Sequence, residues 1–354
     1  MRAAHRAASA PIAMNTLRVL SLAASATLFA SISTAQVTSS TLSIGAPGSP
    51  GCQAGTNSPL LSDGSVATGI MQIHYDASSA ILTLAVDNTS PVIAASNPLV
   101  TDIYLNAPVG AVTGATLINQ VGSGGANPAF TLAFDADNTT APSLPRADCF
   151  GHFSIQLSVG GLPGDIGNAA ASTFAVPASQ VVRGPVTFTL QLTVNGVITA
   201  SAFTEWQSWN AANVATQGGA LAFGGAGANN DGAGFVGHPF QCKTAMFTRG
   251  LPRIGTTFDF CMTGPECCHL CIWASLNPGP TFFLGYRIDL GFPVIGIYDF
   301  GFLPREGLIC TSIPVPNNRS AIGATVYFVN ATYLSGYPAE TLNVSDGLAL
   351  TVVN

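Results

Sequence analysis

The chain has 354 residues, a formal net charge of −6, and charged side chains at only 8% of its positions. Soluble domains usually carry about 25% charged residues, so the polar surface of this protein must come mostly from Ser, Thr, Asn and Gln. Its 11 basic residues are outnumbered by 17 acidic ones. No basic patch is present, which argues against a nucleic-acid partner.

Residues 1–35 have the pattern of a secretory signal peptide. Met14–Arg18 is a short basic region, Val19–Ile32 is apolar, and Ser33–Ala35 fits the small-residue rule of a cleavage site. The apolar run is shorter than the roughly 20 residues that span a bilayer, so we expect no transmembrane anchor. The sequence therefore predicts a secreted, extracellular protein, with attachment at the cell surface left open.

From residue 36 onward, apolar and polar side chains alternate with a period of two. This pattern is typical of antiparallel strands that bury one face. The predicted strands end at turn residues or glycines and cover 82–86, 130–134, 153–159 and 186–194.

The clearest local signal is Asn195-Gly196, which follows the strand at 186–194. Asn-Gly between two alternating runs favours a tight hairpin, because both turn positions need positive φ. The sequence therefore predicts that 186–194 pairs with a second strand at 197–206.

The chain changes character near Pro239–Cys242, where we place a domain boundary between an N-terminal β-sandwich at 36–238 and a C-terminal domain at 239–354. About seven short strands in the C-terminal part match the size and spacing of an immunoglobulin-like sandwich. The strands expected there include 256–260, 281–290, 324–333, 342–344 and 348–352.

Four C-terminal segments together resemble a β-sandwich module found in secreted proteins of planctomycete-type bacteria, over about 240–354. They are 250–258, 313–318, 323–328 and 345–352. The N-terminal part is similar, more loosely, to the extracellular β-sandwich domains of choice-of-anchor, sorting-tagged surface proteins. The segments that carry this second likeness are 101–105, 112–114, 148–153 and 186–206. Both resemblances imply an extracellular β-protein, and neither supplies a catalytic residue.

Four of the eight cysteines fall within 261–271. A zinc site would want two spaced Cys-x-x-Cys pairs, and a redox pair would want a helix N-terminus. Neither context is present, so in a secreted chain we expect disulfides. Cys52 and Cys149 are expected to pair in the N-terminal domain, and the cluster is expected to close a small loop. The disulfide candidates are Cys52, Cys149, Cys242, Cys261, Cys267, Cys268, Cys271 and Cys310.

Hydrolase signatures such as Gly-x-Ser-x-Gly and His-Glu-x-x-His do not occur in the sequence. His74 fits a strand position better than a catalytic base, and His152 beside Asp148 fits a turn. We therefore predict no catalytic residue, metal ligand or cofactor. Trp206 and Trp209 are candidate ligand contacts, since exposed indole rings suit carbohydrate.

The sequence as a whole predicts a non-catalytic extracellular or cell-surface protein of structural or adhesion type. Its partner would be a cell-surface or matrix protein or a glycan, and the oligomeric state is left open. Two alternatives remain, which are a carbohydrate-binding module that uses Trp206 and Trp209, and a secreted hydrolase of undescribed type.

Overall fold

The computed structural model describes residues 37–45, 51–52, 65–91, 99–122, 130–136, 146–147, 151–159, 185–204, 218–224, 234–237, 244–264, 268–283, 286–304, 307–334 and 342–354. Every pair of strands in these residues is antiparallel. Helix in the described residues is limited to two 3-10 turns, η3 (Ala200–Phe203) and η4 (Arg319–Ala321). The predicted all-β class is therefore confirmed. The predicted signal peptide lies outside the described residues.

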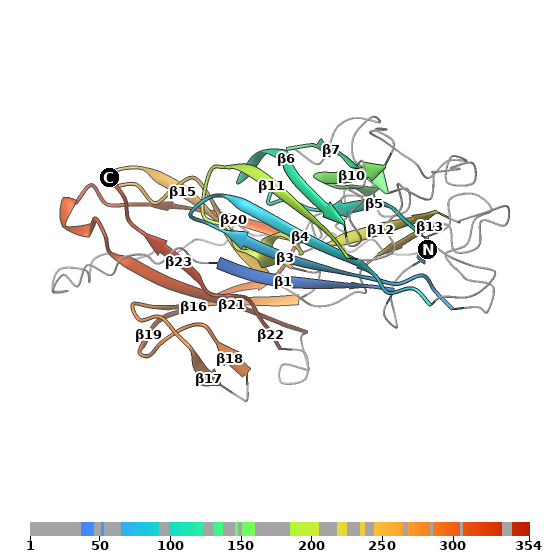
Figure 1. Ribbon diagram of the computed structural model, residues 1–354. Coiled ribbons are helices and arrows are strands. Elements are labelled where there is room, and N and C mark those ends of the chain that lie inside the picture. The colour runs from blue at the N-terminus through green and yellow to red at the C-terminus, as the bar shows by residue number, and fades with distance from the viewer. Residues whose placement is uncertain are drawn as a thin grey trace, which may run out of the picture.

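Two large sheets form the N-terminal part of the molecule (Figure 1). The first is five-stranded, in the order β1 (Val37–Ile44), β3 (Gly69–Asp76), β4 (Ile81–Asn88), β11 (Val186–Val194) and β6 (Val112–Gly122). The second is six-stranded, in the order β2 (Gly51–Cys52), β13 (Gly234–Gly237), β12 (Gly219–Gly224), β5 (Leu99–Leu105), β10 (Ile155–Val159) and β7 (Phe130–Phe134). A small separate pair joins β8 (Arg146–Ala147) and β9 (Gly151–His152).

One hydrophobic core fills the space between these two sheets. Strand β4 shows why, because its even-numbered residues from Leu82 to Val86 are buried while its odd-numbered ones are partly exposed. The first sheet contributes Leu84 and Phe188, and the second contributes Ile103 and Leu157. The alternation that predicted half-buried strands is thus the alternation that builds this core.

The C-terminal part contains two further sheets. One is three-stranded, in the order β14 (Ala245–Arg249), β15 (Thr257–Thr263) and β20 (Leu308–Pro314). The other has the order β19 (Val294–Phe302), β16 (Cys268–Ser275), β21 (Thr325–Leu334) and β22 (Asn343–Val344), and β23 (Leu348–Thr351) also pairs with β21. A second apolar cluster lies between them and includes Phe260, Met262, Leu270, Ile272 and Leu350.

The core of the N-terminal sheets continues into the C-terminal part. Ala245, Phe247 and Cys261 belong to the same buried cluster as Leu84 and Phe188. The predicted boundary, between residues 238 and 239, lies outside the described residues and stays a prediction. The described strands on its two sides nevertheless share one core.

The predicted hairpin at Asn195-Gly196 is wrong. Both edges of β11 are occupied, one by β4 and the other by β6. The backbone beyond Val194 instead joins β14, since the Val197 N–H donates to Thr248 Oγ1 at 2.8 Å and the Thr248 N–H donates to the Val197 carbonyl at 2.9 Å. Residues 200–203 then form η3 rather than a strand.

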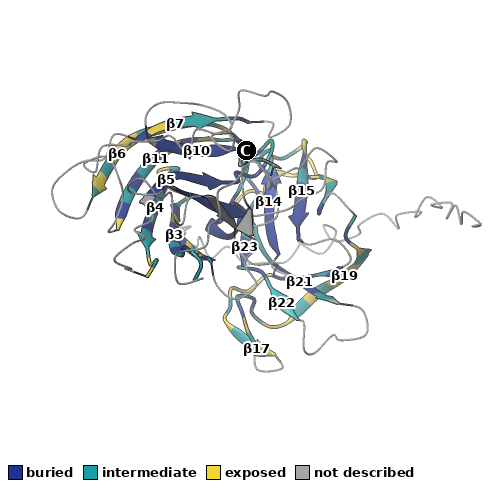
Figure 2. Cartoon of the chain, turned by 90° about the vertical axis from the view of Figure 1, so that its right-hand side faces the viewer, coloured by how far each residue is buried: buried dark blue, intermediate teal, exposed yellow. Residues whose placement is uncertain are grey.

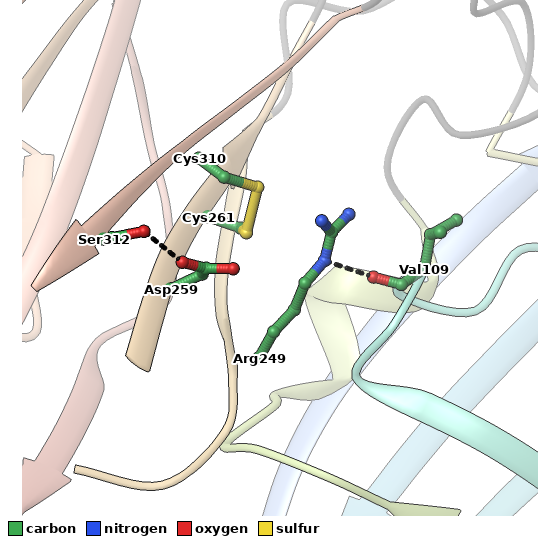
Figure 3. The surroundings of a disulfide bond; sticks show 6 residues. All are labelled: Val109, Arg249, Asp259, Cys261, Cys310 and Ser312. Atoms are coloured by element: carbon green, nitrogen blue, oxygen red, sulfur yellow. Dashed lines mark hydrogen bonds between the residues drawn. A yellow bond between two sulfur atoms is a disulfide. The ribbon is translucent and has the colours of Figure 1, made fainter. Parts of the chain in front are cut away.

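A disulfide joins β15 to β20 close to the shared core. Cys261 and Cys310 are direct register partners on these strands, and they are bonded to each other (Figure 3). Nearby, Arg249 on β14 points toward the N-terminal sheets, and its Nε donates to the Val109 carbonyl at 2.7 Å. This contact and the continuous core hold β14 against the N-terminal half of the protein.

Candidate functional site

The connection between β16 and β19 forms a projecting hairpin. Within residues 276–293, β17 (Thr281–Phe283) pairs with β18 (Tyr286–Ile288), so the single strand predicted at 281–290 is two short strands. Ile288 and Leu290 are buried against Val329 of β21. The hairpin lies at the lower edge of the molecule in Figures 1 and 2. It is anchored on one face and open to solvent on the other.

Exposed apolar side chains are concentrated on this hairpin and on β19. Of the eleven exposed large hydrophobic residues in the described part of the chain, six lie within residues 276–297 and a seventh ends β19. We call these seven the β17–β19 surface, and they are Leu276, Phe282, Phe283, Phe292, Ile295, Ile297 and Phe302. Exposed apolar patches of this kind mark binding surfaces when they are contiguous.

The strand register and a ring contact connect two members of this surface, Ile297 and Phe283, through Trp273. Trp273 of β16 is the register partner of Ile297 on β19. The Trp273 ring also contacts Phe283 of the hairpin, with centroids 5.5 Å apart and planes at 84°. Trp273 is half-buried between them, so it supports the surface from below.

A row of three rings crosses the far end of the same sheet face. His269 of β16 stacks on Tyr333 of β21, with centroids 4.9 Å apart, and meets Phe302 of β19 edge-on at 5.2 Å. His269 Nε2 also lies 3.4 Å from Asp299 Oδ1, and Asp299 is mostly exposed. This end of the surface therefore combines aromatic rings with one exposed carboxylate.

Cys271 lies between Trp273 and His269 on the same face of β16. Its thiol is half-buried and donates to the Ala331 carbonyl at 3.7 Å. Burial, and next the negative charge of Asp299, raise the pKa of Cys271. Because a nucleophilic or metal-binding cysteine needs its thiolate form, this environment disfavours both roles for Cys271.

The outer edge of β19 is irregular. The register with β16 slips between Leu270 and Cys271 and again between Ala274 and Ser275, so that Phe300 and Ile295 are extra residues on β19. Among the described residues, β16 is the strand that pairs with β19. Bulges of this kind twist an edge strand and oppose the addition of a further strand. The surface is therefore suited to side-chain contacts rather than to strand pairing.

The described cysteines of the cluster at 261–271 lie in different surroundings, and Cys267 lies outside the described residues, so the small loop expected of the cluster stays a prediction. Cys261 pairs with Cys310 on the neighbouring strand. Cys268 is buried in the second apolar cluster, whereas Cys271 faces the β17–β19 surface. Cys271 was expected in a disulfide but is a free thiol, because its register partners are Ala331 and Asp299.

The remaining predicted disulfide positions cannot be placed in the fold. The side chain of Cys52 and all of Cys149, Cys242 and Cys267 lie outside the described residues. Their pairing therefore stays a prediction.

The tryptophan of the candidate site is Trp273, which the sequence did not single out. Trp206 and Trp209, the predicted ligand contacts, lie outside the described residues, so carbohydrate binding through them stays a prediction. The signal that could have identified Trp273 is the alternation along Cys268–Ser275, which places Trp273 on the same strand face as His269 and Cys271.

A second group of polar side chains is buried in the six-stranded sheet. Asp102 of β5 has no exposed surface, and its Oδ1 accepts a hydrogen bond of 3.0 Å from Gln156 Nε2 of β10. Gln156 Nε2 also donates to the Tyr104 hydroxyl at 3.3 Å. Burial raises the pKa of Asp102 to about 6, while hydrogen bonds from Ser158, Gln156 and Thr101 act in the opposite direction.

The histidines considered as catalytic candidates fall in separate places. His74 is exposed on β3, and its Nδ1 lies 2.7 Å from Ser39 Oγ on β1. His152 is half-buried on β9, and Asp148 lies outside the described residues. Within the ranges that the structure describes, no three His, Cys, Asp or Glu side chains are grouped closely enough to hold a metal ion.

Comparisons of the chain with protein-family models and with curated proteins gave no match. The two resemblances drawn from sequence segments therefore stay predictions. In the described residues, no helix has the length and apolar character needed to cross a bilayer.

Proposed function

We propose that the protein is a non-catalytic extracellular or cell-surface protein of structural or adhesion type, and that it binds its partner through the β17–β19 surface. The observation that carries this proposal is the concentration of seven exposed large apolar residues on one projecting hairpin and its neighbouring strand. Exposing such side chains costs solvation free energy, about 25 cal/mol per Å². A binding partner that covers them recovers this free energy.

The architecture proposed with this function is a pair of β-sandwiches, of which the C-terminal one is immunoglobulin-like. Two apolar clusters, each between antiparallel sheets, support this arrangement. The signal-peptide pattern at 1–35, with its apolar run at Val19–Ile32, supports secretion. In this arrangement the hairpin between β16 and β19 is a loop at the margin of a rigid scaffold, where binding residues are commonly found.

Attachment to the envelope of the producing cells tests the proposed function. Full-length protein is incubated with washed envelopes, and bound protein is measured after sedimentation. We expect F282S combined with I297T to reduce attachment at least about tenfold, because contact residues of this type commonly contribute more than 1 kcal/mol each. Both positions are exposed, with 71% and 69% of their surface accessible, so the fold should be retained.

The matched control is I118T with V121S, which removes two exposed apolar residues from β6 in the N-terminal sheet. Attachment should be unchanged in the control. Equal attachment of the wild type and the F282S/I297T variant would overturn the proposal that this surface carries the function.

A further inference from the structure

The outer edge of strand β20 presents main-chain hydrogen-bonding groups to solvent. Strand β20 is the last strand of its three-stranded sheet, and among the described strands it pairs with β15 alone. At one end of this pairing, the Gly264 N–H donates to the Gly307 carbonyl at 2.9 Å. At the other end, the Val315 N–H donates to the Thr256 carbonyl at 2.8 Å. The register between these two bonds contains no shift, so the odd-numbered residues of β20 bond to β15 and the even-numbered ones face outward.

The position of the disulfide agrees with this assignment. Cys261 and Cys310 are register partners with Cα atoms 4.1 Å apart, and in an antiparallel ladder the closer pairs are those that exchange no hydrogen bonds. Leu308, Cys310 and Ser312 therefore direct their N–H and C=O groups away from β15. In the described part of the chain, these outward groups have no hydrogen-bond partner. All residues of β20 are at least partly exposed, whereas most of β15 is buried.

Strand β20 lacks the usual protections of a sheet edge. Natural edge strands carry charged side chains, bulges or internal prolines, which prevent unwanted pairing. Strand β20 has no charged residue, and its proline is the final residue, Pro314. Its register with β15 is regular, whereas the register of the edge strand β19 shifts twice. The edge of β20 is therefore suited to receive a further strand.

The side chains of β20 determine which kind of strand would fit beside it. Leu308 and Cys310 pack against the core of the N-terminal sheets. Ile309 and Ile313, on the opposite face, pack against the second apolar cluster. All four are only partly buried, so both clusters are incompletely covered at this edge. An added strand would cover both, because alternate side chains of a strand point to opposite faces. The matching segment is therefore uncharged and apolar on both faces.

We infer that β20 accepts an extended segment of a partner polypeptide as a fourth strand beside β14, β15 and β20. The main chain of Leu308, Cys310 and Ser312 supplies the hydrogen bonds, and the two apolar clusters select a segment without charges. In strand addition of this kind, main-chain bonds give affinity and alternate side chains give specificity. The site is independent of the proposed function, because β20 and the β17–β19 surface belong to different sheets.

Binding of a peptide to the full-length protein tests the inference. The probe is the fluorescein-labelled peptide KKTVIVIVKK, whose centre favours an extended strand that is apolar on both faces, while its lysines keep it soluble. A twin peptide carries N-methyl groups on the six central amides, which removes the donors from both edges and leaves charge and side chains unchanged. Fluorescence anisotropy is measured with protein up to about 300 µM, which covers weak complexes. We expect the probe to bind and its twin to bind at least about tenfold more weakly.

Ser312→Pro is the matching change in the protein. Proline removes the outward N–H of residue 312, and edge strands tolerate it where the N–H faces solvent. Ser312→Ala is the control, since both variants lose the hydrogen bond that Ser312 Oγ donates to Asp259 Oδ1 at 2.6 Å (Figure 3). We expect Ser312→Pro to weaken probe binding at least about tenfold. Ser312→Ala and the F282S/I297T variant should bind like the wild type. Circular dichroism of each variant verifies that the fold is retained.

Four results would overturn the inference. A probe that does not bind the wild type, or that binds Ser312→Pro as tightly as Ser312→Ala, excludes strand addition at β20. Equal binding of the N-methylated twin to the wild type reduces the contact to side chains and charge, and this comparison decides the matter if Ser312→Pro does not fold. A wild type that forms oligomers, which Ser312→Pro abolishes, makes a second copy the occupant. Envelope attachment is measured separately with F282S/I297T, so the proposed function stands or falls independently.

Discussion

At the scale of single residues, the most consequential side chain outside the candidate site is the carboxyl of Asp102. It lies fully inside the six-stranded sheet with Gln156 and Tyr104 as polar neighbours. Because burial penalises its charged form, its pKa is raised to about 6. A carboxyl held in this way binds its proton more tightly in the folded protein than in the unfolded chain. Its effect on stability is therefore opposite to that of most surface carboxylates.

Asp102→Asn should stabilise the protein at pH 8 and change little at pH 4. Asp102 contributes favourably to the free energy of unfolding below a pH of about 3.8, its pKa in the unfolded chain. This contribution is lost as pH rises through about 6, its pKa in the folded protein. The difference between the two pKa values corresponds to about 3 kcal/mol at most. Urea unfolding of the wild type and of the Asp102→Asn variant at pH 4, 6 and 8 measures the difference in their free energies of unfolding. A stability difference that is the same at every pH would contradict this role.

Asp76→Asn is the control for the sign of this effect. Asp76 is exposed, and hydrogen bonds from Ser78 and Ser79 lower its pKa. Its contribution is therefore present at neutral pH and is lost as pH falls through its folded pKa, the reverse of Asp102. The two variants should have pH profiles of opposite slope.

Gly196→Ala should destabilise the protein by more than about 3 kcal/mol, as large effects follow from strain and backbone clashes. Gly196 has φ of 147°, and a Cβ atom placed there would overlap the Thr248 carbonyl oxygen on β14. Gly323→Ala is the matched control, since its φ is 85° and nothing lies within 4 Å, so we expect only about 1–2 kcal/mol. Thermal unfolding measures both variants. Equal losses would mean that the approach of β14 to Gly196 is unimportant.

At the scale of elements, the Cys261–Cys310 bond ties β15 to β20 across 49 residues of chain. Replacing both cysteines by valine should lower the free energy of unfolding by about 4 kcal/mol in the chain-entropy account. Guanidinium unfolding under oxidising conditions measures the change. Adding reductant should then destabilise the wild type more than the double variant, which lacks this bond but keeps the other cysteines. Identical unfolding midpoints for the two oxidised proteins would contradict this contribution.

The alternation of side chains located several of the described strands but could not determine their partners. It found β4, β7, β11 and β21 to within a residue or two, because a half-buried strand leaves a period-two pattern in its own sequence. It failed at Asn195-Gly196, where the local turn preference loses to the hydrogen bonds between Val197 and Thr248, which lies 51 residues further along the chain. It also missed that residues 281–290 turn back on themselves. Pairing depends on contacts that no local window contains.

At the scale of the whole molecule, the candidate site could not have been predicted from the sequence. Phe282, Phe292 and Ile297 have the sequence pattern of ordinary strand or core residues. The projecting connection leaves Phe282 and Phe292 exposed, and a position on the edge strand β19 leaves Ile297 exposed. The cysteine cluster drew attention to 261–271 through its spacing. The structure places Cys261, Cys268 and Cys271 of that cluster on scaffold strands and the exposed surface in the residues that follow.

The core shared by the two halves of the molecule has a consequence for the order in which the chain folds. Leu42 on the first strand and Phe247 on β14 belong to the same cluster, and Leu308 and Cys310 pack against it. During synthesis, the N-terminal sheets therefore remain incompletely covered until most of the chain has been made. Such long-range contacts slow folding and prolong the exposure of apolar surface. Dilute refolding of the full chain should for this reason be more efficient than refolding at high protein concentration.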